Sequence, residues 1–310
     1  MNNFLLIFVS LGLGFLLKKS SRFPASTPAA LNSFVICISL PAIILQQIPT
    51  LISNTSLTSE LLIPISMAWI LFFMSWLLFT YLGKVRHWSR ARTGALILTA
   101  GLGNTSFVGL PLLEALHGSK ALPWGLLIDQ LGSFLTLSTV GILIASRYGN
   151  PKDGKRRSTT SQIIRFPPFI ALVVATILGV LGIEHTETSR DLFSRLGGTL
   201  VPIALVAVGF QLKLSRSIIA RYWKPLGFGM LFKLFLAPLL LLGLYCFASG
   251  ELSFVTRITI LEAAMATMIT SAVVASDFGL DEELANLMVG VSIPLSLVTV
   301  PLWDYFLGLI

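Results

Sequence analysis

The sequence predicts an all-α polytopic membrane protein with ten transmembrane helices arranged as two inverted five-helix repeats. Three observations predict this class: an apolar composition, a one-sided distribution of lysine and arginine, and a proline pair at a wide interval. Of the 310 residues, 55% are hydrophobic and 12% are charged, whereas about a quarter of the residues in a soluble domain are charged. Because a spanning helix needs roughly 20 apolar residues, the chain accommodates about ten spans and leaves no room for a large soluble domain.

Ten apolar segments divide the chain, and each is apolar on most sides, as a helix in lipid must be. They cover residues 3–18, 27–48, 60–83, 92–115, 121–146, 167–183, 192–212, 225–248, 254–277 and 283–309. The first segment is interpreted as a span and not as a removed signal peptide, because the basic residues Lys18, Lys19 and Arg22 follow it.

Basic residues orient these spans. Seventeen of the 22 lysines and arginines lie in the connections after spans one, three, five and seven. By the positive-inside rule these connections face the cytoplasm, so we expect a multi-pass protein of the inner (plasma) membrane with both termini extracytoplasmic. The basic run at 152–157 fits the same rule, with contact to anionic membrane lipid as the second interpretation. The formal net charge of +8 therefore does not indicate a nucleic-acid partner.

The longest polar segment lies at the middle of the chain and separates two groups of five spans. An odd number of spans in each half inverts the second half relative to the first, as in many secondary transporters. Pro41 in span two and Pro202 in span seven lie 161 residues apart, and the same interval relates Asn104 in span four to Met265 in span nine. The predicted divisions are a first repeat at 1–146, a basic cytoplasmic linker at 147–166 and a second repeat at 167–310.

Span four contains a segment, 101–111, that disfavours a continuous helix. Pro111 lacks a backbone donor and its ring clashes with the preceding turn, while Gly103 and Gly109 lower the helical preference. Backbone groups left unpaired at membrane depth persist only where protein or water satisfies them. We therefore expect two half-helices that meet near 104–109 at a central site, with a proline kink that only shapes packing as the alternative.

Such a break creates a place for an anion. The half-helix that begins after it presents free amides and the positive end of its dipole, which suits a carboxylate. Asn104, Thr105 and Ser106 supply further hydrogen-bond donors. The expected partner is a small organic anion.

The string GNTSFVGLPLLEALHG at 103–118 resembles the fourth helix of the auxin efflux carrier family, in which an asparagine is followed by Gly-x-Pro-Leu. The resemblance extends over the whole chain. It includes the Leu-Pro of the second helix within 31–46, the Pro and Gly of the seventh within 199–212, and the Ala-rich ninth helix at 262–278. The tenth helix, with Pro294 and Pro301, fits as well.

This resemblance implies a ten-helix transporter whose broken helices four and nine cross at the membrane midplane. The crossing would lie between a scaffold domain of helices one, two, six and seven and a transport domain of helices three to five and eight to ten. Plant members carry auxin, bacterial relatives are associated with dicarboxylates such as malate or malonate, and the bile acid/sodium symporters are more distant relatives.

The resemblance also implies which residues form the site. It places substrate contacts at Asn104 and at or next to Gln130, and by symmetry a second set in helix nine. Helix nine departs from the family, because Ala263–Met268 contains no proline at the expected break. The full set of predicted substrate-binding residues is Asn104, Thr105, Ser106, Gln130, Met265, Thr267 and Met268, with Thr270 and Ser271 satisfying backbone groups and Gly103, Gly109, Pro111, Pro41 and Pro202 as crossover or hinge positions.

Three ionisable residues lie about a third of the way into apolar spans: Asp129, Lys233 and Glu262. A charge at bilayer depth costs at least ~2.5 kcal/mol, so each is a candidate for ion coupling. The alternatives are a helix-to-helix hydrogen bond for Asp129, snorkelling to the interface for Lys233, and an ion pair with Arg257 for Glu262. Coupling to protons, to sodium or to neither stays open.

Patterns typical of enzymes and metal sites do not occur in the sequence. His87, His117 and His185 lack metal-ligand spacing, Cys37 and Cys246 lie apart in apolar runs, and there is no Walker-type loop. We therefore expect no enzyme, metal or cofactor, but a secondary transporter that works by elevator-type alternating access. A sodium-coupled bile-acid-like symporter, a channel and a membrane sensor are the rival functions, and the sequence leaves a homodimer open.

Overall fold

The computed structural model is all-helical over the residues that it describes, apart from one isolated β-bridge. These residues are 2–20, 22–24, 26–54, 61–149, 165–183, 185–211, 216–249 and 252–309. Most of the predicted linker 147–166 lies outside them, including the basic run at 152–157.

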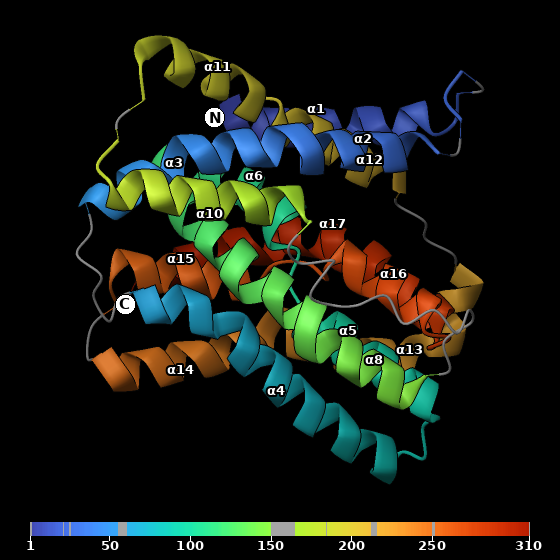
Figure 1. Cartoon of the computed structure of the whole chain (residues 1–310). Helices are drawn as coiled ribbons and strands as arrows, with labels where there is room; N and C mark the ends of the chain where they lie inside the picture. The colour runs from blue at the N-terminus through green and yellow to red at the C-terminus, as the bar shows by residue number, and fades with distance from the viewer. Residues whose placement is uncertain are drawn as a thin grey trace. The chain divides into compact units, whose positions relative to one another are not determined.

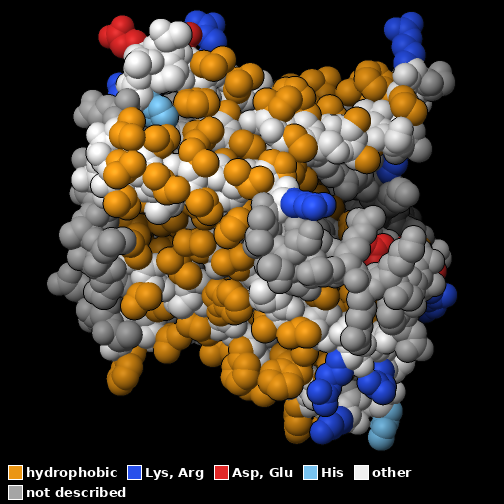
Figure 2. Space-filling view, in the orientation of Figure 1, with side chains coloured by type: hydrophobic (Ala, Val, Ile, Leu, Met, Phe, Trp, Pro, Cys, Tyr) orange, Lys and Arg blue, Asp and Glu red, His pale blue; other side chains and the backbone are white. Residues whose placement is uncertain are grey.

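Six helical segments within this part of the chain are long and apolar enough to cross a membrane. They are Thr27–Ser53, Leu62–Val85, Ser119–Tyr148, Glu187–Gln211, Ser217–Phe247 and Glu282–Leu307. Two shorter apolar helices cover Leu5–Leu17 and Pro167–Val180. Hydrophobic side chains spread over the helix surfaces (Figure 2), as expected for helices that face lipid. The prediction of a polytopic membrane protein is confirmed.

The chain divides into two compact units. Unit 1 comprises Met1–Leu61, Ser106–Leu126 and Thr160–Leu212, and unit 2 comprises Leu62–Thr105, Leu127–Thr159 and Lys213–Ile310.

Unit 1 is built on two helix pairs. Helix α1 (Asn2–Leu17) packs on α12 (Leu200–Gln211), and α10 (Pro167–Val180) packs on α3 (Leu40–Asn54), as Figure 1 shows. Glycine permits the close approach in both pairs, because a Cβ atom at Gly14 would collide with the Val206 carbonyl of α12 and one at Gly179 with the Pro49 carbonyl of α3. The two glycines lie 165 positions apart in the sequence.

The other described helical segments of unit 1 are short. They are α2 (Thr27–Phe34), the π turn η1 (Val35–Ser39), most of the π turn η3 (Thr105–Gly109), α6 (Leu110–His117), the 3₁₀ turn η4 (Ser119–Ala121), most of α7 (Leu122–Leu127) and α11 (Glu187–Gly197). The hydroxyls of Ser39 and Thr199, 160 positions apart in the sequence, form a hydrogen bond of 2.7 Å. Pro41 and Pro202 lie in the first turns of α3 and α12.

The helices of unit 2 include α4 (Leu62–Val85), α5 (Arg90–Gly101), α8 (Ile142–Tyr148), α13 (Arg216–Leu231), α14 (Ala237–Ser249), α15 (Phe254–Ala263), α16 (Ile269–Asp277) and α17 (Glu282–Leu307). Helix α4 packs on α5, α14 packs on α15, and α17 packs on both α13 and α16. The hydroxyls of Ser89 and Ser253 cap α5 and α15 by accepting from the Arg92 and Thr256 amides. These capping serines lie 164 positions apart.

Candidate functional site

Two helices of unit 2, α5 and α15, end inside their apolar segments. Residues 102–104 and 264–268 leave the helical conformation, and they meet in an isolated antiparallel β-bridge between Gly103 and Thr267. Both interruptions are buried. The two breaks therefore form one structure, although they are far apart in the sequence.

Backbone groups of the two breaks satisfy one another. The Asn104 amide donates to the Ala266 carbonyl at 2.7 Å, and the Met268 amide donates to the Leu102 carbonyl at 3.1 Å. A side chain from α17 contributes as well, since the Ser292 hydroxyl accepts from the Thr267 amide at 2.9 Å. Non-helical backbone at membrane depth needs this kind of partner.

The break in span four differs in detail from the prediction. It lies at 102–104, before the expected 104–109, because residues Thr105–Gly109 already form the π turn η3. Pro111 does not interrupt the helix: it lies in the first turn of α6, where a proline costs no helical hydrogen bond. Ser106, Gly109 and Pro111 all belong to unit 1.

Lys233 lies fully buried beside the paired breaks. It is part of the π turn η7 (Phe232–Leu236), and its Nζ donates to the carbonyl oxygen of Ala263 at 3.1 Å. Ala263 is the last residue of α15, so the ammonium meets the negative end of that helix dipole. The expectation that Lys233 snorkels to the interface is wrong, because the carbonyls exposed by the break are within its reach.

Glu262 precedes Ala263 and is 0% exposed. Neither carboxylate oxygen has a hydrogen-bond partner among the described residues. The side chain interacts electrostatically with both Lys233 and Asp129. It does not pair with Arg257, which instead contacts the Asp304 carboxylate at 3.3 Å.

Asp129 has hydrogen-bond donors of its own. It lies in the π turn η5 (Ile128–Phe134) and accepts from the Thr105 hydroxyl at 2.5 Å and from the Gln130 amide group at 2.7 Å. The bond from Thr105 is the inter-helix hydrogen bond that the sequence offered as an alternative role for Asp129. The Gln130 side chain is thereby held next to the breaks instead of facing lipid.

Five of the predicted polar residues thus lie in three π turns: Thr105 and Ser106 in η3, Asp129 and Gln130 in η5, and Lys233 in η7. Such turns are frequent at functional sites, because one extra residue redirects the side chains of a helix. The amino-acid pattern contained no signal for them.

The predicted site residues of span nine differ in their burial and in their hydrogen bonds. Met265 and Thr267 are fully buried at the break, Met268 is nearly so, and the Ser271 hydroxyl donates to the Met268 carbonyl as expected for a backbone partner. Thr270 faces away and is exposed, so its predicted role is wrong. Ser292 was not predicted, although it lies 163 positions after Asp129 and the repeat interval points to its neighbourhood.

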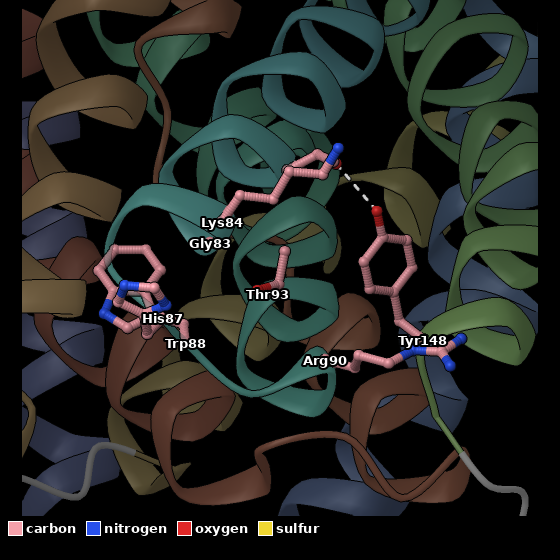
Figure 3. A pocket seen from close by; sticks show the side chains of 8 residues that line it. Gly83, Lys84, His87, Trp88, Arg90, Thr93 and Tyr148 are labelled. Atoms are coloured by element: carbon pink, nitrogen blue, oxygen red, sulfur yellow. Dashed lines mark hydrogen bonds between the residues drawn. The ribbon is translucent and has the colours of Figure 1, made fainter.

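A separate surface cavity of about 460 Å³ lies in unit 2 at the ends of α4, α5 and α8. Lys84, His87 and Arg90 line it together with Tyr148, which shares a hydrogen bond with Thr80 (Figure 3). None of the predicted site residues lines this cavity. We take the paired breaks as the candidate site, because among the described residues only they combine interrupted backbone with buried ionisable side chains.

The site has the groups that an anion requires. The first turn of α16 begins at the break without a side-chain cap, so its amides and the positive end of the helix dipole face that region. The Lys233 ammonium lies close by, and a Cβ atom at Gly103 would come within 3.1 Å of it. The described residues contain no group of three or more His, Cys, Asp or Glu side chains that could hold a metal ion.

Comparison with known proteins gives a consistent result. A family described as membrane transport protein matches residues 1–304. An uncharacterized transporter of Methanothermobacter thermautotrophicus is 27% identical over 97% of this chain and 96% of its own length. The uncharacterized transporter YfdV of Escherichia coli K12 is 25% identical over 96% and 95%, and an uncharacterized transporter of Methanocaldococcus jannaschii is 23% identical over 89% of each chain.

The match covers nearly the whole chain, and this family consists of membrane transporters and is not an enzyme class. The helices described above agree with a multi-pass membrane protein. The chain therefore belongs to the membrane transport protein family and is a transporter of the bacterial auxin efflux carrier type.

Proposed function

We propose that the protein is a secondary transporter of small organic anions, either auxin-like carboxylates or dicarboxylates. The substrate carboxylate would bind at the paired breaks in α5–η3 and α15–α16. The observation that carries this proposal is the Gly103–Thr267 bridge. The buried Lys233 ammonium lies at the C-terminal end of α15, and the first turn of α16 has no side-chain cap. In a site that excludes water, these groups stabilise negative charge far more than at a surface.

Ten helices in two inverted repeats are part of the same proposal. The six long segments, the two shorter apolar helices and the two interrupted helices would make up the ten. Residues that perform matching tasks support the repeat, because they recur at intervals of 160 to 165 positions. The matching pairs are Gly14 and Gly179, Ser39 and Thr199, Ser89 and Ser253, and Gly103 and Thr267.

Elevator-type alternating access requires two bodies that move as units, and the division of the chain into two compact units supports it. Unit 2 would be the transport body, since it holds Asn104, Gln130, Lys233 and Glu262. Unit 1 would be the scaffold and contains helices one, two, six and seven, with 106–126 in addition. In the inner membrane, both termini would be extracytoplasmic. This orientation follows from the lysine- and arginine-rich connections, which would face the cytoplasm.

Asn104 is the side chain to test first. It is buried beside the bridge that its own amide helps to form. In proteoliposomes loaded with radiolabelled malonate, malate or indole-3-acetate, Asn104→Ala should reduce counterflow exchange at least tenfold. Asn286→Ala, at an exposed position of α17, is the matched control and should exchange normally.

The outcomes separate the rival functions. Unchanged exchange in Asn104→Ala would reject this residue as a ligand. Conductance without counterflow would indicate a channel, binding of a probe without flux would indicate a sensor, and strict sodium dependence would indicate a symporter of the bile-acid type.

A further inference from the structure

Among the described residues of unit 2, the two buried carboxylates differ in their hydrogen bonds. Asp129 accepts hydrogen bonds from Thr105 and from Gln130, whereas neither oxygen of Glu262 has a partner among the described residues. Hydrogen bonds to a carboxylate are strong and favour its ionised form. A buried carboxylate without donors is costly as an anion. Asp129 therefore has the hydrogen bonds that a buried anion needs, whereas an ionised Glu262 is stabilised only by its charge interaction with Lys233.

Charged groups around Glu262 make its protonation depend on other charges. Lys233 of η7 and Asp129 of η5 both interact with it electrostatically. On the helices that pack on α15, Tyr245 of α14 bonds to Ser66 and Asp304 of α17 pairs with Arg257. Glu282, Glu283 and Tyr305 of α17 are exposed. Lys84 and Tyr81 of α4 are exposed. The Lys233 ammonium favours an ionised Glu262, and the Asp129 carboxylate opposes it. Any group that occupies the ammonium therefore favours the protonated form of Glu262.

An incoming anion would compete with an ionised Glu262 for the same ammonium. Two unpaired negative charges in a buried site repel each other strongly, so the anion and the ionised form of Glu262 exclude each other. Anion binding therefore requires that Glu262 take up a proton from the side on which the anion enters.

We propose that Glu262 is the proton-coupling residue and that one proton travels with each anion as symport. This inference rests on the proposed function and specifies its energy source. On loading, the Glu262 carboxylate accepts a proton from water as the anion binds; on release to the other side both leave, and the carboxylate is regenerated. Lys233 supplies the fixed cation of the site, so no sodium ion is needed.

Linkage makes the proposal measurable. If the anion favours the protonated form of Glu262, protons favour anion binding by the same factor. The apparent Kd should rise with pH, by up to about tenfold per pH unit for one linked proton. Addition of anion to unbuffered protein should likewise remove protons from the solution.

The experiment uses the full chain in proteoliposomes with radiolabelled malonate, malate and indole-3-acetate as probes. Counterflow without a pH gradient reports transport, accumulation driven by an imposed pH gradient reports coupling, and an internal pH dye reports proton entry. In the wild type, accumulation should follow the pH gradient and be indifferent to sodium. Glu262→Gln, which mimics the neutral acid, should abolish gradient-driven accumulation and flatten the pH dependence of probe binding. The control Glu114→Gln, outside the cluster, should retain both.

The outcomes distinguish the two proposals. If the wild type shows counterflow but no proton entry, or if Glu262→Gln still accumulates the probe in response to the pH gradient, the coupling proposal is wrong and the transport proposal stands. If the wild type exchanges none of the probes, the proposed function fails and the coupling proposal fails with it. Dye-monitored proton uptake by the wild type on probe addition requires no variant, so a folding defect in Glu262→Gln leaves the test intact.

Discussion

The Nζ atom of Lys233 lies 3.1 Å from the carbonyl oxygen of Ala263, the residue at which α15 ends. The ammonium of Lys233 in η7 thus interacts with the negative, C-terminal end of α15. This relationship makes the break in α15 tolerable inside a membrane, and it places a positive charge beside Gly103.

Lys233→Met should preserve the length of the side chain and remove its charge. We expect a loss of anion exchange of at least tenfold, because the fixed cation of the site is gone. Lys224→Met, at an exposed position of α13, should exchange like the wild type. Counterflow of the labelled probes in proteoliposomes measures both, and equal activity of the two variants would contradict the assigned role of Lys233.

Gly103→Ala tests the close approach at the bridge. A Cβ atom there would lie 3.1 Å from Lys233 Nζ and 3.3 Å from the Glu262 carbonyl oxygen. The lysine must therefore shift, and we expect a loss of about 1–3 kcal/mol in stability from overpacking together with reduced exchange. Gly227→Ala in α13 meets no atom within 4 Å and should be neutral or slightly stabilising. Thermal unfolding in detergent compares the two, and equal melting temperatures would argue against the tight fit.

Much of this arrangement can be predicted from the sequence, and the failures have physical reasons. The glycines of span four indicated the break, because local helical preference is low there. Pro111 misplaced it by a few residues, since a proline is harmful inside a helix and harmless in a first turn. In span nine no proline marks the break. The position of this break depends on the Ser292 hydroxyl and on the bridge to Gly103.

Tertiary contacts determine the interaction partners of the ionisable residues, and sequence spacing does not reveal such contacts. Glu262 lies five residues after Arg257, yet the arginine pairs with Asp304, which the fold of α17 brings closer. Lys233 finds its partner 30 residues away, at a carbonyl that is free only because α15 ends there. The π turns are equally hidden, since they change the register of a helix without a characteristic residue pattern.

Thr105→Val should remove one of the hydrogen bonds to the Asp129 carboxylate. The buried charge loses a donor, so we expect a loss of about 1.5–3 kcal/mol in the free energy of unfolding and weaker exchange. Thr176→Val removes a hydroxyl that donates only to a carbonyl of its own helix and should cost much less. Chemical denaturation of both variants checks this difference, and a similar loss in the two would show that the Asp129 contact contributes little.

Gly14→Ala and Gly179→Ala test the matching helix pairs of unit 1. At each position the new methyl group would meet the backbone of the partner helix, which cannot shift as a flexible side chain can. Both substitutions should destabilise the protein by about 1–3 kcal/mol or more, whereas Gly243→Ala, with no atom within 4 Å, should be tolerated. A marked loss in only one of the two variants would weaken the structural repeat.

Electron cryo-microscopy of the protein with bound malonate tests the central claim most directly. We predict density for a carboxylate at the Gly103–Thr267 bridge, in contact with Asn104 and within reach of the Lys233 ammonium. A continuous helix through 101–111, or ligand density only in the surface cavity at Lys84, His87 and Arg90, would contradict the account.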